Sequence, residues 1–150
     1  MNMVFPTLYK KLNLNFIEKV HGPGHPMFTE ALHDMAQTYR KKRKYTKAKV
    51  LYRRLLVSME DAMGPNHPDL APYLNALAAV YVRLAEYSKA EALLQRSVQI
   101  VERTFGPDHA NAAAALGTLS DLYEVMGDSS RARAFRDRAQ KTREGAPAPA

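Results

Sequence analysis

The stretch GPNHPDLAPYLNALAAVY, residues 64–81, contains the two features from which the fold can be predicted. Its first five residues nearly recur as GPGHP from Gly22 and as GPDHA from Gly106, so the phrase returns at an interval of 42 residues. A fixed period between about 20 and 50 residues is typical of stacked repeat arrays. We therefore expect the chain to consist of like units rather than one irregular domain.

The rest of the stretch has the periodicity of one face of a helix. Leu74, Leu77, Ala78 and Tyr81 follow the i, i+3, i+4, i+7 spacing. Asp69 is expected to cap this helix, and Pro72 falls in its first turn, where a missing N–H costs little. Extended to all units, the pattern predicts first helices over 27–42, 69–84 and 111–126, and second helices over 46–63, 88–105 and 130–143. The second helix over 88–105 has a broad apolar face: Ala90, Leu93, Leu94, Val98, Val101 and Phe105.

The recurring phrase has the composition of a helix–helix connection. Gly64 suits a left-handed residue that ends a helix, Pro65 prevents its continuation, and Pro68 suits the start of the next helix. The histidines His25, His67 and His109 are then structural loop residues. The alternative is zinc, which needs nitrogens about 2 Å from one centre. Packed helices lie on the order of 10 Å apart, so three successive repeats are not expected to share one ion.

The first residues resemble the second half of a unit. LYKKLNLNFIEKVHG (8–22) is similar to LYRRLLVSMEDAMG (51–64), with one additional residue. The predicted organisation is a lead 1–6, an array 7–143 and a disordered tail 144–150, and the array divides into a partial unit 7–21 and units 22–63, 64–105 and 106–143. The apolar Phe16 and Ile17 are expected to join a preceding unit or another copy of the chain. The last helix has the polar outer face that suits a terminal cap.

Composition excludes several classes of protein. The 150 residues contain no cysteine, which excludes disulfides and thiolate metal sites. No apolar run approaches the roughly 20 residues of a membrane span, and MNMVFPTLYKK lacks the apolar stretch of a signal peptide; a cytoplasmic location is therefore expected. The sequence has no nucleophile–base–acid set, no glycine-rich phosphate loop and no HExxH motif. Neither enzyme activity nor a cofactor is expected.

The net charge of +7 is unevenly distributed. Residues 1–63 carry 12 Lys and Arg against 5 Asp and Glu, whereas residues 64–150 carry 10 against 10. This asymmetry favours an acidic partner. The densest basic feature is YRKKRKYTKAK (39–49), with its basic core at 40–44. It has three interpretations: a solvated turn, a polyanion-binding or nuclear-import signal, or the positive end of a binding groove. No helix-turn-helix or zinc-finger spacing accompanies it, so nucleic acid is not the expected partner.

Paired helices of the form LxxLAxxYxxxxxYxxAExLxxRxxxIxE between GPxHP loops resemble tetratricopeptide repeats of the extended type found in kinesin light chains. The resemblance is carried by LNALAAVY (74–81), EYSKAEALLQRSVQIVE (86–102) and the three loop phrases, and it covers about residues 7–143. It implies an all-α fold, a right-handed α-α superhelix of about seven helices, whose concave groove binds partners. The implied function is that of a non-catalytic scaffold for protein–protein interaction.

In arrays of this family the first helix of each pair lines the groove. The candidate peptide-binding residues are those on these helices that do not face the core: His33, Gln37, Arg40, Lys41, Asn75, Ala79, Val82, Arg83, Asp121 and Glu124. Asn75 matches the first asparagine of the LNNLA pattern, whose asparagines hold the backbone of an extended peptide in that family; Ala76 replaces the second. The charges predict a groove that takes an extended acidic segment at its positive end. An alternative is a structural piece of a longer array with no ligand of its own.

Overall fold

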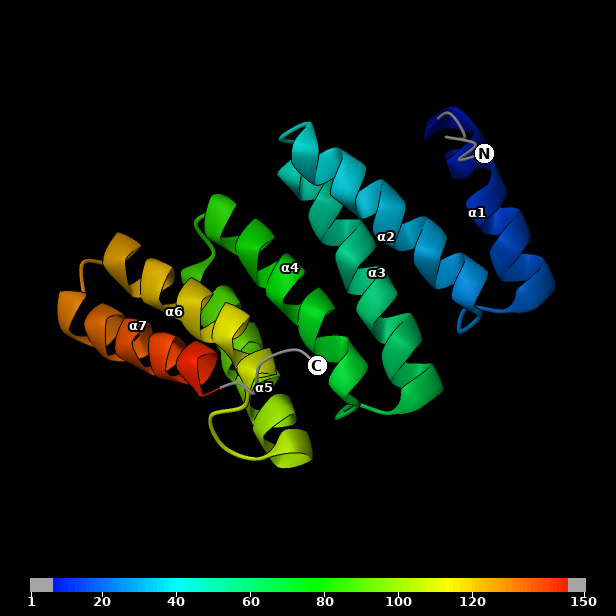
Figure 1. Cartoon of the computed structure of the whole chain (residues 1–150). Coiled ribbons are helices and arrows are strands. Elements are labelled where there is room, and N and C mark those ends of the chain that lie inside the picture. Colours follow the sequence, from blue (N-terminus) through cyan, green and yellow to red (C-terminus); the bar gives the residue numbers. More distant parts are fainter. Residues whose placement is uncertain (1–6, 146–150) are drawn as a thin grey trace. The chain divides into compact units, whose positions relative to one another are not determined.

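The computed structural model describes residues 7–145, which form seven α-helices and two 3-10 turns without any strand (Figure 1). They fall into two compact units that divide between Pro65 and Asn66. The first unit contains α1 (Thr7–His21), α2 (Pro26–Lys41) and α3 (Tyr45–Met63). The second contains η1 (Pro68–Leu70), α4 (Ala71–Arg83), α5 (Tyr87–Phe105), η2 (Ala110–Ala112), α6 (Ala113–Val125) and α7 (Ser129–Glu144). The predicted all-α class with about seven helices is confirmed.

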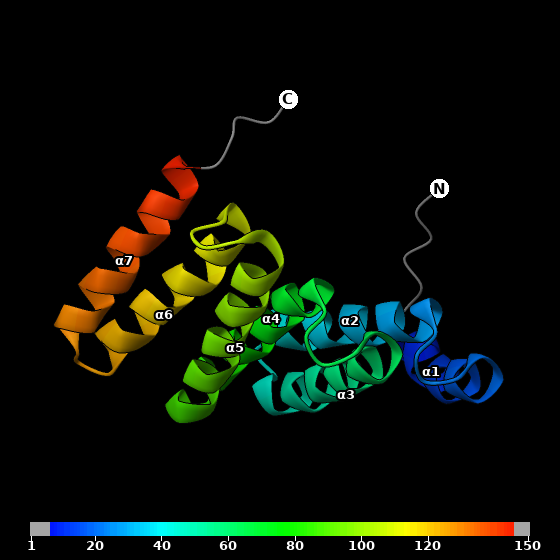
Figure 2. The same ribbon diagram turned by 90° about the horizontal axis from the view of Figure 1, so that it is seen from below.

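The apolar periodicity of the sequence becomes the core of each helical hairpin. α2 packs against α3, α4 against α5, and α6 against α7 (Figure 2). In α4, Leu74 and Ala78 have no exposed surface, and Leu77 and Tyr81 are only 3% and 7% exposed. The spacing of three and four residues therefore directs one face of α4 inward, as the sequence predicts. None of the helices between residues 7 and 145 combines the length and the apolar character that crossing a membrane requires.

The three turns within the hairpins share one geometry. Arg43, Ala85 and Gly127 occupy the same position of the turn, with positive φ angles of 57°, 58° and 81°. The N–H groups of the next residues, Lys44, Glu86 and Asp128, donate to the carbonyls of Tyr39, Tyr81 and Tyr123 at 2.8, 2.9 and 2.8 Å. The N–H groups of Arg43, Ala85 and Gly127 donate to the carbonyls of Arg40, Val82 and Glu124 at 3.0 Å. This is the Schellman motif, which satisfies the last carbonyls of a helix and favours glycine at the positive-φ residue.

This turn geometry predicts that Ala85→Gly stabilises the protein. A left-handed conformation costs a residue with a Cβ roughly 1–2 kcal/mol, while glycine loses about 0.5–1 kcal/mol more entropy than alanine on folding. We expect a net gain of about 0.5–1 kcal/mol in the free energy of unfolding, measured by urea denaturation. The matched control Ala134→Gly, at an exposed position inside α7, should lose stability. A loss at both positions would contradict the turn geometry.

The repeated histidines cap the helices that follow them. Nδ1 of His25, His67 and His109 accepts a hydrogen bond from the backbone N–H two residues later, at 3.2, 3.1 and 3.2 Å. Their backbone is extended, with φ near −72°, as is usual for an N-cap residue. The prediction that Asp69 caps its helix is therefore wrong. Asp69 lies inside η1, where its own N–H is the donor to His67.

Contacts between helices also recur with the period of the sequence. Lys47, Lys89 and Arg131 lie over the rings of Tyr39, Tyr81 and Tyr123 at 5.5, 5.6 and 5.2 Å. Arg54 of α3 pairs with Glu18 of α1, and Arg138 of α7 pairs with Glu102 of α5. Both ion pairs join residues 36 positions apart.

All helix limits lie within two residues of the predicted ones, and the differences have two causes. The first turns predicted for the helices at 69 and 111 are 3-10 turns, so α4 and α6 begin at Ala71 and Ala113. α7 continues to Glu144 and is capped by Gly145, so the helix extends into the predicted tail. The rest of that tail, 146–150, and the predicted lead 1–6 lie outside the described residues.

Candidate functional site

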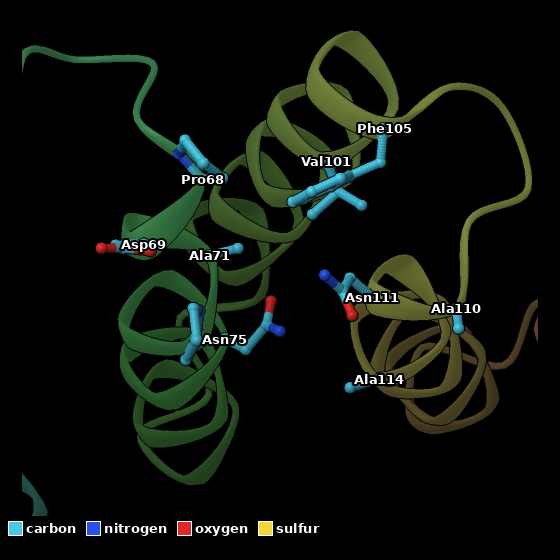
Figure 3. A pocket seen from close by; sticks show the side chains of 10 residues that line it. Pro68, Asp69, Ala71, Asn75, Val101, Phe105, Ala110, Asn111 and Ala114 are labelled. Atoms are coloured by element: carbon cyan, nitrogen blue, oxygen red, sulfur yellow. The ribbon is translucent and has the colours of Figure 1, made fainter. Parts of the chain in front are cut away.

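A cavity lies in the second unit between the first turns of α4 and α6 (Figure 3). Its volume is about 610 Å³. Val101 and Phe105, from the end of α5, form one wall. Pro72 of α4 also lines the cavity. The site lies where the turns η1 and η2 lead into the two first helices, next to the last turns of α5.

Asn75 and Asn111 face each other across this cavity (Figure 3). Asn75 comes from the second turn of α4 and is half-buried, whereas Asn111, in η2, is exposed. The Oδ1 atom of Asn75 is buried and has no hydrogen-bond partner among the described residues. A buried polar atom without a partner costs roughly 1–3 kcal/mol. The site therefore combines apolar walls with a half-buried amide whose Oδ1 has no partner among the described residues.

The other predicted residues of α4 follow Asn75 along the helix. Ala79 and Val82 are half-buried, and Arg83, in the last turn, is exposed. No carboxylate among the described residues pairs with Arg83. The guanidinium group is therefore available to an acidic group of a ligand.

The two acidic residues predicted on α6 differ from each other. Asp121 is exposed and lines a hollow between α6 and α7. Glu124 pairs with Arg136 of α7, with 2.9 Å between Oε1 and Nη2. The sequence analysis assigned both carboxylates to a ligand, and it missed that the second helix of the same hairpin supplies an arginine to one of them.

The first unit holds the remaining predicted residues on α2. Gln37 Nε2 and His33 Nε2 lie 3.0 Å apart in a hydrogen bond along the helix. Arg40 is half-buried and Lys41 is exposed. Burial raises the pKa of the Tyr52 hydroxyl, and the positive charge of Arg40 opposes part of that rise.

The basic run 40–44 covers the end of α2 and the turn into α3. Lys41, Lys42, Arg43 and Lys44 are exposed, and only Arg40 is half-buried. Their exposure is compatible with each of the three interpretations of this run, which stay predictions.

The sequence patterns behind this architecture match a known family. The tetratricopeptide repeat family matches residues 27–102 and residues 74–144, which together include most of the chain. The chain belongs to the tetratricopeptide repeat family. Repeats of this family generally mediate protein–protein interactions. No curated protein sequence matches the chain as a whole or in part.

Solved tetratricopeptide structures have the same fold. BtubC (BKLC) from P. vanneervenii is similar with a TM-score of 0.81 and 21% identity, over 96% of this chain and 59% of that protein. Two structures of a putative kinesin light chain from Podosopora anserina, with nearly identical TPR-like repeats, give TM-scores of 0.78 and 0.77 at 18% identity. They are matched over 91% of this chain and 64% of their own length. At these identities the likeness shows the fold, a TPR-like solenoid of the kinesin-light-chain type.

In this tetratricopeptide array the loop histidines have a structural role. Each uses Nδ1 to accept the backbone hydrogen bond of the following turn, and His109 also stacks on Phe105 with 4.6 Å between ring centroids. Within residues 7–145 there is no group of three or more His, Asp or Glu side chains placed to hold a metal ion.

Of the residues that line the tetratricopeptide cavity, only Asn75 was predicted as a site residue, and Phe105 and Asn111 are two that were missed. Phe105 was predicted in the apolar core face of its helix, but it is 46% exposed and covers the cavity. It is the last residue of α5. Asn111 was predicted only as a helix start. Its place opposite Asn75 depends on the distance between helices, for which the sequence has no signal.

Proposed function

We propose that this tetratricopeptide protein binds an extended, acidic segment of a partner protein on the exposed faces of its first helices. In the second unit the contact surface is the α4–α6 cavity with Asn75, followed by Ala79, Val82 and Arg83. In the first unit it is the α2 surface with His33, Gln37, Arg40 and Lys41. We propose these two surfaces as separate contact sites.

The observation that carries the proposal is the buried Oδ1 of Asn75, which has no partner among the described residues. An amide offers both an acceptor and donors, as a peptide group does, so it can pair with a backbone of any sequence. The resemblance to kinesin light chains adds that asparagines at this position hold a peptide backbone in that family. The apolar walls of the cavity can receive a side chain of the same segment.

The acidic character of the ligand is supported by the charges. Arg83 is exposed without a carboxylate partner within residues 7–145, and Lys41 is exposed at the end of α2. Arginine can bind a carboxylate through two parallel hydrogen bonds. Asp121 lies at the α6 side, where the corresponding part of the ligand should carry no negative charge.

Replacing Asn75 by alanine and Arg83 by glutamate tests this proposal. Wild-type and Arg83→Glu proteins are used in a pull-down with mass spectrometry, and the segment recovered by wild type is titrated calorimetrically. Asn75→Ala should weaken binding about threefold to tenfold, the effect of one hydrogen bond. Arg83→Glu should weaken it at least about tenfold, because it replaces a charge-assisted bond by repulsion.

Arg53→Glu is the charge-matched control, since Arg53 is exposed on the second helix α3. It should leave the affinity unchanged, and circular dichroism should show the same helical signal for all variants. If neither Asn75→Ala nor Arg83→Glu changes the affinity, the assignment of the surface fails. Binding to heparin or duplex DNA that decreases steeply with salt would instead support polyanion binding through 40–44.

A further inference from the structure

The outer face of α7 has an unusual charge pattern. Four side chains follow this face at spacings of three or four residues: Arg133, Arg136, Gln140 and Arg143. We call this set the basic stripe. The positions 42 residues earlier, on α5, are Glu91, Leu94, Val98 and Val101. The same face is thus largely apolar on α5 and basic on α7, the second helices of two successive repeats.

On α5, the corresponding positions lie on a buried face. α6 packs against α5, and Leu94, Val98 and Val101 are at most 6% exposed. At one end of the stripe, Glu91 accepts a hydrogen bond from the Tyr123 hydroxyl of α6. Burial raises the pKa of Tyr123, as does this bond, so the hydroxyl stays a donor. This face of α5, which we call the α5 stripe, is therefore a surface against which a helix packs.

The corresponding surface on α7 is open in the described part of the chain. All four members of the basic stripe are exposed. Beside it, between α6 and α7, lies a hollow of about 300 Å³ whose lining includes Gly117, Asp121, Arg136 and Arg143. A Cβ at Gly117 would lie 3.3 Å from Nη2 of Arg143. Glycine inside α6 thus leaves room for this guanidinium group to lie across the hollow.

The basic stripe also differs from the other cations of α7 in its partners. Arg138 pairs with Glu102, Lys141 with Asp108, and Arg131 with Asp128. In contrast, Arg133 and Arg143 have no carboxylate partner among residues 7–145. Arg136 pairs with Glu124 at 2.9 Å, but both side chains are exposed. Such a pair contributes about 0–1 kcal/mol, so Arg136 can exchange it for a carboxylate of a ligand.

We propose that the basic stripe and the hollow beside it are a docking site for an acidic helix of a partner protein. We infer that the ligand is a helix because α6 packs against the equivalent stripe on α5. An acidic helix fits because the apolar Leu94 and Val101 are replaced by Arg136 and Arg143. Arg133 and Arg143 are ten residues apart, about 15 Å along α7. A partner helix with glutamates at i, i+3 and i+10 presents carboxylates at the same spacings, with small residues facing Gly117. This site is separate from the cavity between α4 and α6, but Asp121 lines its hollow, so the part of the helix that faces Asp121 should carry no glutamate.

Two synthetic alanine-rich helical peptides of about 18 residues, long enough to be partly helical in water, test the proposal. One carries glutamates at i, i+3 and i+10, and the other carries glutamines there. Fluorescence anisotropy should show binding of the glutamate peptide and about threefold to a hundredfold weaker binding of the glutamine peptide, since each of the three exposed ion pairs contributes about 0.2–1 kcal/mol. Arg133→Gln/Arg136→Gln/Arg143→Gln should cause the same loss. Circular dichroism and thermal melting check that the variant remains folded.

The matched control removes the same charge elsewhere: Lys19→Gln/Arg53→Gln/Arg103→Gln, three exposed positions on α1, α3 and α5. It should retain the wild-type affinity, as should Asn75→Ala. Arg136→Glu should recover affinity for a peptide with lysine at the matching position. Three results would each overturn the proposal. The first is that the glutamate peptide does not bind, and the second is that the control triple variant loses as much affinity as the stripe variant. The third is that a duplex DNA oligonucleotide binds more strongly than the peptide and depends on the same arginines.

Discussion

Leu77→Ala is expected to lower the free energy of unfolding by about 2–5 kcal/mol, the range for a large-to-small change in a packed core. Leu77 is 3% exposed and lies on the face of α4 that packs against α5. The substitution removes buried methyl and methylene groups and leaves a cavity that the surrounding helices fill only in part. Urea denaturation followed by circular dichroism measures the effect, with the midpoint decreasing at an unchanged slope.

Asn75→Ala is the control on the same helix. Asn75 is half-buried and its Oδ1 has no partner among the described residues. Its removal therefore breaks no hydrogen bond through this atom and relieves the cost of a buried polar group. The change in stability should be far below that of Leu77→Ala. Equal losses at the two positions would mean that the inward and outward faces of α4 are reversed, and the candidate site would be lost with them.

Gly106→Ala is expected to lower the free energy of unfolding by about 1–3 kcal/mol, the cost of a sparsely populated backbone conformation. Gly106 caps α5 with φ 93° and ψ 168°, a region that only glycine adopts readily. The sequence analysis predicted a left-handed residue at this position of the phrase. The positive φ is confirmed, but the extended ψ, also seen as 162° at Gly64, makes the requirement for glycine stricter.

The effect of Gly106→Ala is one of backbone alone, because a Cβ at Gly106 would meet no atom within 4 Å. Gly64→Ala, with nearly the same angles, should cost a similar amount. Gly145→Ala is the control, since Gly145 caps α7 with a φ of −78° that alanine adopts freely, and it should change the stability little. A loss at Gly145 as large as at Gly106 would exclude the backbone explanation.

The helices and their inward faces could be predicted from the sequence because they depend on local spacing. Leu74 and Tyr81 are buried wherever the helix meets any neighbour, and the glycines and prolines of the phrase terminate helices by their own backbone restrictions. The prediction of the N-cap residue was wrong, because aspartate is a common N-cap residue and histidine is not. Only the structure shows that the imidazole of His67, and not Asp69, has its acceptor within reach of the η1 N–H group.

The candidate site was predicted only in part, because its properties depend on distances between helices. Asn75 was identified from its position on the helix, but its buried and unpaired Oδ1 is a property of the packing. Phe105 was placed in the core because an apolar residue in register is usually buried, yet at the last position of α5 it is 46% exposed and stacks on His109. Glu124 was treated as free because nothing in a single helix indicates that Arg136 of the next one reaches it.

The sequence by itself determined that this chain consists of repeated helical hairpins. The period of 42 residues and the spacing of apolar side chains by three and four positions are both properties of the sequence. Tertiary structure alone decided which polar groups are left for a partner. The reason is physical: a hydrogen bond or ion pair requires two groups within about 3–4 Å. Residues as far apart in the chain as Glu102 and Arg138 meet that condition only after the hairpins have packed.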